Sequence, residues 1–267
     1  MQKSILKLSL VLFALATLAA FSSPKPDTDA KSKALIKALY KVNGGWAKLA
    51  AKKDVQYTYV YQDFNKKGTD LSTERYMFSN EASWAEYKQH EINVLPTMKG
   101  VAKQVVMNGD AKIMLGDKNI EDPQAIGGTH FLRVANFFWF TMMYKLDDPG
   151  TSHTYMGQEE INGINYDKVS LTYVPAEVGK DVNDEYILYF NPKTHLVDLF
   201  MFSIPAMEVM KPILKMELDY EEVDGVLIAT SRRAFAPNGE GGFVQMGEYL
   251  SKDIKFGNKF TDADFKL

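Results

Sequence analysis

Cysteine is absent from the 267 residues of this chain. Its absence excludes a thiol nucleophile, a disulfide framework and a lipid-modified cysteine. An exported chain without disulfides depends on its hydrophobic core, and the roughly 245 residues left after removal of an export signal are enough to build one. We therefore expect the mature protein to be soluble rather than anchored by an acyl chain.

Histidine is scarce as well, and its spacing gives no catalytic motif. The four histidines are His90, His130, His153 and His195. No two of them stand four residues apart, and His-Glu-x-x-His is missing, so a zinc-hydrolase site has no support. No serine lies in Gly-x-Ser-x-Gly, and Asp117, Asn119 and Glu121 lack the glycine and distal glutamate of a calcium loop. We predict no catalytic residue, no metal site and no cofactor, and therefore no enzyme.

The charge balance excludes a further class of partner. Lysine and arginine number 31 against 34 aspartates and glutamates, which gives a formal net charge of −3. Removal of Lys3 and Lys7 with an export signal makes this −5 (−3 − 2). Nucleic-acid binding needs a basic face, so we predict no nucleic-acid partner.

The amino terminus has the pattern of an export signal. Lys3 and Lys7 precede an apolar run from Leu8 to Phe21, and the small residues Ala19 and Ala20 lie at its end. The run is short for a membrane-spanning helix, which needs roughly 20 apolar residues. We interpret residues 1–22 as a signal peptide, with an uncleaved anchor as the alternative. Residues 23–29 are predicted to be a flexible leader and residues 30–267 a single domain, located in the periplasm of a Gram-negative bacterium.

The most distinctive stretch is Phe131–Leu146, which has helical spacing and is apolar nearly all round. On one side, at intervals of three and four, lie Phe131, Ala135, Phe138, Trp139, Met142 and Leu146. We expect this regular face to pack on a sheet. The remaining surface mixes aromatic and polar side chains, which suits a cavity for an amphipathic ligand. The predicted ligand-binding residues are Arg133, Asn136, Phe137, Phe140, Tyr144 and Met143, with Phe137 and Phe140 against an apolar chain and Arg133 and Tyr144 near a head group.

Most of the remaining chain has the period-two alternation of β-strands. An amino-terminal helix is predicted over residues 30–42, capped by Asp29 and ended by Asn43-Gly44-Gly45. About ten strands follow. The dipeptides Asn108-Gly109, Asn162-Gly163 and Asp224-Gly225 indicate tight hairpins. Residues 84–92 fit either a strand or a short helix. The pattern favours an α+β fold, mainly antiparallel β, with a sheet that curls around the central helix.

Three segments resemble a known group of proteins. They are Val42-Asn43-Gly44-Gly45-Trp46, the stretch from Asn136 to Gly150, and Tyr189-Phe190-Asn191-Pro192-Lys193-Thr194-His195-Leu196. These segments are similar to uncharacterised exported proteins of the LolA-like lipoprotein-carrier superfamily. The resemblance implies an incomplete, open curved β-barrel with helices in its concave face, where the best understood members carry acyl chains. No residue set matches their lipoprotein-handling residues, so the resemblance does not identify a ligand.

These observations lead to three hypotheses. The first is a periplasmic, non-enzymatic carrier or sensor that binds a lipid or other long apolar ligand between the sheet and the central helix. Flexible methionines in the second half of the chain, such as Met143, suit such a ligand. The second is a structural or interaction protein whose barrel is filled by its own helices, and the third is an exported hydrolase. We expect a monomer with a lipid or acyl-chain ligand and a transient membrane or envelope-protein partner.

Overall fold

The computed structural model describes residues 27–175 and 182–267. The predicted signal peptide (1–22) and the first part of the predicted leader (23–26) lie outside the described residues. The described chain forms a 13-stranded sheet in the order β6-β5-β4-β3-β2-β1-β13-β12-β11-β10-β9-β8-β7. The sheet ends at β6 on one side and at β7 on the other, so it curves without closing into a barrel.

All neighbouring strands are antiparallel. The strands are β1 (Asp54–Asp63), β2 (Gly68–Met77), β3 (Ala82–His90), β4 (Ala102–Met107), β5 (Asp110–Leu115), β6 (Lys118–Asn119), β7 (Thr151–Ile161), β8 (Ile164–Tyr173), β9 (Tyr186–Phe190), β10 (Val197–Ile204), β11 (Val209–Val223), β12 (Val226–Pro237) and β13 (Phe243–Phe256). The helices are α1 (Ala30–Asn43), α2 (Gly45–Ala50) and α3 (Pro123–Thr141), and the 3-10 turns are η1 (Met142–Tyr144), η2 (Pro205–Met207) and η3 (Asp262–Phe265).

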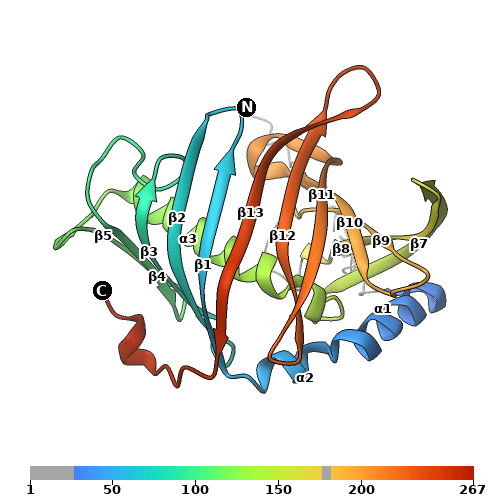
Figure 1. The fold of residues 1–267 in the computed structure, drawn as a ribbon, viewed down its shortest axis with the longest axis horizontal. Helices are drawn as coiled ribbons and strands as arrows, with labels where there is room; N and C mark the ends of the chain where they lie inside the picture. Colours follow the sequence, from blue (N-terminus) through green and yellow to red (C-terminus); the bar gives the residue numbers. More distant parts are fainter. Residues whose placement is uncertain (1–26, 176–181) are drawn as a thin grey trace, which may run out of the picture.

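The sheet curves around α3, as Figure 1 shows, with α1 and α2 along one end. We call the sheet face toward α3 the inner wall. Side chains from this wall and from the end of α3 form the two largest clusters of buried apolar residues. The structure thus confirms a mainly antiparallel α+β fold with an open curved sheet around a central helix.

The central helix begins earlier in the chain than the sequence pattern indicated. The side chain of Asp122 caps it by accepting a hydrogen bond from the backbone N–H of Ala125 at 2.8 Å. Pro123 occupies the first helical position, where its missing N–H is not needed. The expected start at Phe131 was therefore too late. The α-helix ends at Thr141, and η1 continues the chain as a tighter turn.

The helix buries the face that we predicted to line a cavity. Arg133, Phe137 and Phe140 are buried, whereas Phe131 on the predicted sheet-packing face is 49% exposed. Of the other residues on that predicted face, Ala135, Phe138 and Trp139 are partly buried, and Met142 and Leu146 are buried. The prediction is therefore wrong for Phe131. The physical reason is that the inner wall itself mixes tyrosine rings with polar groups, so a mixed helix face matches it better than a purely apolar one.

The end of the predicted leader is held against β7. Thr28 forms an isolated parallel bridge with His153, and the N–H of His153 donates to the carbonyl of Asp27 at 2.8 Å. Asp29 caps α1 as expected, accepting from the N–H of Ser32 at 2.9 Å. Residues 27–29 are thus hydrogen-bonded rather than flexible.

The predicted hairpin turns are present. Asn108, Asn162 and Asp224 have φ angles of 53°, 52° and 51°, the left-handed conformation that these turns require. The ambiguous stretch near Trp84 is strand β3. Within the described residues, no helix is both long enough and apolar enough to cross a membrane.

Candidate ligand-binding sites

A buried polar network joins α3 to the inner wall. The guanidinium of Arg133 donates to the carboxylate of Glu74 on β2 and, at 2.6 Å, to the hydroxyl of Tyr87 on β3. Ser72 and Tyr76 donate to the same carboxylate at 2.7 and 3.2 Å. Burial alone would lower the pKa of Arg133, but the Glu74 carboxylate raises it above the usual range. Arg133 is therefore charged and already neutralised, so the predicted head-group role does not fit it.

Aromatic rings fill the interface beside this network. Phe140 stacks on Tyr57 with ring centroids 5.1 Å apart, and its edge contact with Tyr76 has a centroid distance of 5.6 Å. Phe137 contacts the same Tyr76 ring at 5.4 Å. Such pairs contribute about 0.5–1.5 kcal/mol each beyond their burial. The two phenylalanines expected to line an open cavity are thus part of the packed core.

A small void remains between the end of α3 and the sheet, with a volume of about 10 Å³. Its lining is largely apolar and includes Trp139, Phe140, Met143, Tyr144, Tyr220 and Arg232. A space of this size holds about one water molecule and not an acyl chain. Among the six predicted ligand-binding residues, Phe140, Met143 and Tyr144 line the void, and Arg133, Asn136 and Phe137 lie outside it.

The segment 142–148 follows α3, and its first three residues, Met142, Met143 and Tyr144, line the void. The hydroxyl of Tyr144 donates to the carbonyl of Leu227 on β12 at 2.6 Å. Burial raises the pKa of Tyr144, so this hydroxyl keeps its proton and stays a donor. The side-chain amide of Asn43 donates to the carbonyl of Met143 at 2.8 Å. These two bonds tie the segment to β12 and to the end of α1.

Arg232 on β12 is a further lining residue, which the sequence analysis did not single out. It is 4% exposed, and within the described part of the chain its guanidinium has no carboxylate partner. A signal for its burial was present in the sequence, because Val226, Ile228 and Ala234 share its period-two phase. Burial along β12 follows this alternation from Val226 to Ala234. An arginine or lysine at a strand position that the alternation assigns to the apolar face therefore indicates a buried cation.

A larger concavity, which we call the outer groove, lies on the opposite face of the sheet. Its volume is about 900 Å³, which is within the range of roughly 300–1,000 Å³ for small-molecule sites. Its floor is a separate cluster of Tyr166, Tyr189 and Leu199. Leu199 alternates with Phe200, which belongs to the inner core, so this groove faces away from α3.

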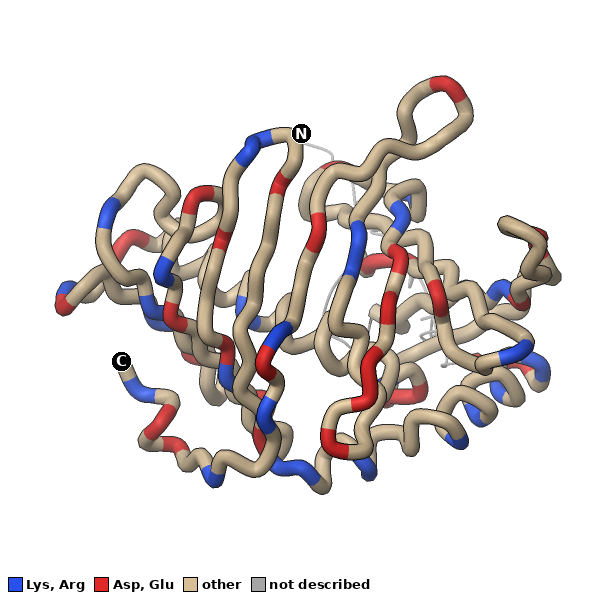
Figure 2. The backbone as a smooth tube through the Cα atoms, viewed as in Figure 1, with Lys and Arg blue, Asp and Glu red and all other residues tan. Residues whose placement is uncertain are grey.

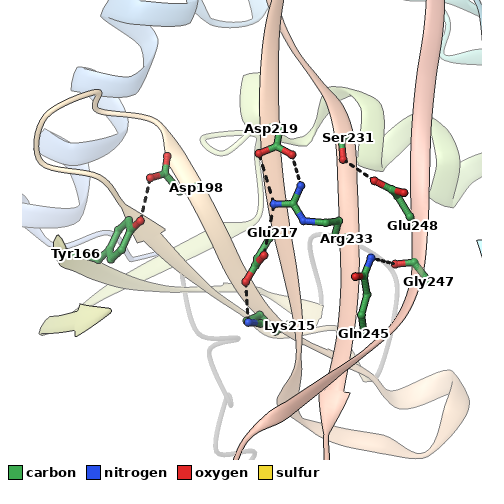
Figure 3. Close-up of polar contacts among 10 residues, drawn as sticks. All are labelled: Tyr166, Asp198, Lys215, Glu217, Asp219, Ser231, Arg233, Gln245, Gly247 and Glu248. Carbon is green, nitrogen blue, oxygen red and sulfur yellow. Dashed lines mark hydrogen bonds and ion pairs between the residues drawn. The ribbon is translucent and has the colours of Figure 1, made fainter. Parts of the chain in front are cut away.

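Charged side chains border the outer groove, and Figure 3 shows their contacts. Lys215 pairs with Glu217 at 2.7 Å, Arg233 pairs with Asp219, and Tyr166 donates to Asp198 at 3.0 Å. Acidic positions recur along β11, as Figure 2 shows. Lys215 and Arg233 are thus paired with carboxylates, so the groove offers space but, among its described residues, no unpaired cation for an anionic ligand.

No group of three or more potential metal-ligating side chains occurs within residues 27–175 and 182–267.

No curated protein matches the sequence. The structure is similar to that of a DUF1329 family protein from Desulfovibrio piger, with 16% identity over 88% of this chain and 96% of that chain and a TM-score of 0.56. It is also similar to a putative outer membrane lipoprotein-sorting protein domain from Vibrio parahaemolyticus, with 10% identity over 87% of this chain and 95% of that chain and a TM-score of 0.52.

These two likenesses show the fold, which is LolA-like, as the three sequence segments indicated. The profile of a protein family matches residues 8–226, which is most of the chain. This protein therefore belongs to the family of unknown function DUF6503.

Proposed function

We propose that this protein is a non-enzymatic carrier or sensor that binds a lipid or other long apolar ligand, such as a lipoprotein acyl chain, between α3 and the inner wall. The observation that carries the proposal is the void that Met142, Met143 and Tyr144 line together with residues of the sheet. It lies where α3 ends and the 3-10 turn η1 begins. Met143 at this junction is a flexible side chain that adapts to apolar shapes.

Because the void is too small for an acyl chain, ligand binding must displace segment 142–148 and enlarge the void. A 12-carbon chain contributes roughly 10 kcal/mol when it is buried, at about 0.8 kcal/mol per CH₂. Association and the displacement of segment 142–148 take several kcal/mol back, which leaves affinities in the micromolar region. The closed void is therefore the ligand-free state, and ligand binding moves Tyr144 and its neighbours away from β12.

Two other readings compete with this proposal. The aromatic stacking at Phe140 favours a barrel that is filled by its own helix and holds no ligand. The volume of the outer groove favours ligand binding on the other face of the sheet. One pair of variants separates all three.

The test is the binding of dansyl-labelled undecanoic acid at micromolar concentration. Ala229→Leu adds bulk to the lining of the void, and Ile164→Glu adds a charge to the outer groove. Both side chains are partly exposed, so both variants are expected to fold, which circular dichroism verifies. We expect Ala229→Leu to bind the probe at least tenfold more weakly than the parent protein. Ile164→Glu should bind it as tightly as the parent protein. The reverse pattern assigns the ligand to the outer groove, and no binding by the parent protein supports the filled barrel.

A periplasmic carrier also needs transient contact with a membrane or an envelope protein. Basic positions recur along α1, as Figure 2 shows. The exposed lysines of this helix are Lys31, Lys33, Lys37 and Lys41. Each lysine near an anionic membrane contributes about 1 kcal/mol. Co-sedimentation with phosphatidylglycerol vesicles should fall for Lys33→Glu/Lys37→Glu, and unchanged sedimentation would favour an envelope protein as the partner.

A further inference from the structure

We infer that the ligand carries an anionic head group and that Arg232 binds this group from the inner wall. This inference rests on the proposed function, because it names the chemical class of the ligand for the same site. It does not extend to the outer groove, where Lys215 and Arg233 already pair with carboxylates.

The first support is the unmet interaction of Arg232 itself. The side chain lies in the middle of β12 and is 4% exposed. Its Nε has no hydrogen-bond partner, and none of the ion pairs among the described residues includes Arg232. Arginine stays charged at any physiological pH. A buried charge without a counter-charge is unfavourable, so an anion from outside the protein gains more here than at a paired arginine.

The second support is the set of groups around this guanidinium. It lies over the ring of Tyr249 at 5.8 Å from the centroid. Burial raises the pKa of Tyr57, Tyr59 and Tyr249, and the charge of Arg232 opposes each of these shifts. The charge of Arg232 therefore lies close enough to the three phenol groups to interact with them electrostatically. Protonated phenols are hydrogen-bond donors, so the surroundings of Arg232 favour an anion.

The third support is that Arg232 lines the apolar void. Trp139, Met143 and Leu218 line the same void. An amphipathic anion therefore places its head group at Arg232 and its chain among these side chains, once segment 142–148 has moved. A carboxylate and a phosphate share the chemistry required of the head group.

The contrast with two other arginines supports this assignment. Arg133 on α3 also has an unpaired Nε, but it is neutralised by the buried Glu74. Arg233, the next residue on β12, projects to the other face and pairs with Asp219 and Glu217. Arg233 is thus a matched control, since it has the same chemistry and the same strand but points to the outer groove.

The experiment measures the displacement of Nile red, a neutral probe, by three ligands of equal chain length. These are dodecanoate, dodecyl phosphate and 1-dodecanol, each titrated into the parent protein, Arg232→Met, Arg232→Lys and Arg233→Met. We expect Arg232→Met to weaken binding of the preferred anion about 10- to 100-fold, the loss typical of a charge-assisted hydrogen bond. Dodecanol should bind Arg232→Met as well as the parent protein, Arg232→Lys should keep part of the anion preference, and Arg233→Met should behave as the parent protein. The two anions distinguish a carboxylate from a phosphate.

Thermal unfolding of the ligand-free variants separates binding from structure. Arg232→Met removes an unpaired buried charge, so its unfolding midpoint should equal or exceed that of the parent protein. If all three ligands bind the parent protein equally and Arg232→Met changes nothing, the inference is wrong while the proposed function stands. If no ligand binds the parent protein, the proposed function itself is wrong. A lower midpoint with equal loss of all three ligands would make Arg232 a structural residue and overturn the inference.

Discussion

Arg133 on α3 and Glu74 on β2 form an ion pair in which both side chains are completely buried. The pair fixes α3 to the inner wall near the middle of the helix. Because two buried charges depend on each other, the loss of one partner is far more damaging than the loss of an exposed pair.

We expect Glu74→Gln to lower the free energy of unfolding by about 3–5 kcal/mol, because it leaves Arg133 charged and buried without a counter-charge. The control is Glu81→Gln, which removes an exposed carboxylate from its pair with Lys145 and should cost at most about 1 kcal/mol. Urea unfolding of both variants gives the comparison. Equal midpoints would show that the Arg133–Glu74 pair does not hold α3 in place.

Truncation of an aromatic side chain to alanine should lower the free energy of unfolding by different amounts on the two faces of α3. Phe140→Ala removes a ring that stacks on Tyr57 and should cost about 3–5 kcal/mol, as for other buried aromatics. Phe138→Ala removes a partly buried ring and should cost less. Urea unfolding checks the order of the two losses. The reverse order would restore the orientation that the sequence pattern suggested for this helix.

The hydrogen bond from Tyr144 to Leu227 closes segment 142–148 on β12. Tyr144→Phe removes this bond and should cost about 1–2 kcal/mol. It should also speed the exchange of a bound fatty acid, because the closed state loses a contact that the open state lacks. Stopped-flow displacement of the dansyl-labelled ligand measures the exchange rate. An unchanged rate would mean that ligands do not pass beneath this segment.

The seam between residues 27–29 and β7 should make stability depend on pH. Burial lowers the pKa of His153 below its usual 6.5, so the unfolded chain takes up a proton more readily than the folded one. The free energy of unfolding is therefore constant in this respect above pH 6.5 and falls as the pH drops below that value. Backbone hydrogen bonds from Ser32 and Tyr155 lower the pKa of Asp29 from 3.8 to about 2, so a second loss follows as the pH falls through that range.

Urea unfolding at pH values from 8 to 2 tests this dependence. His153→Asn should flatten the first decline, and Asp29→Asn should flatten the second. A stability that rises on acidification below pH 6.5 would contradict the assignment of His153 as a buried neutral side chain.

Local patterns in the sequence predicted much of the fold. The alternation in β11 and β12 and the positive-φ turns at Asn162 and Asp224 depend on neighbouring residues, and both are present in the structure. The orientation of α3 was not predictable in this way. It depends on Tyr57 and Glu74, which lie more than 50 residues earlier in the chain and supply the polar and aromatic partners of the mixed face.

The candidate site shows the same limit. Phe140, Met143 and Tyr144 were identified from the helix alone and do line the void. The sequence pointed to Arg133 and not to Arg232, because it does not reveal that a carboxylate lies opposite Arg133. The alternation along β12 predicted that Arg232 is buried, but the sequence did not reveal that it has no carboxylate partner in the described chain.

The most direct measurement of the central claim is photo-cross-linking with a fatty acid that carries a diazirine on its chain, followed by peptide mapping. A ligand between α3 and the inner wall should label peptides that contain Trp139 to Tyr144 and Leu218 to Ala229, which line the void. Ala229→Leu should reduce this labelling. Labelling confined to Tyr166, Tyr189 or other residues of the outer groove, or no specific labelling, would contradict the account.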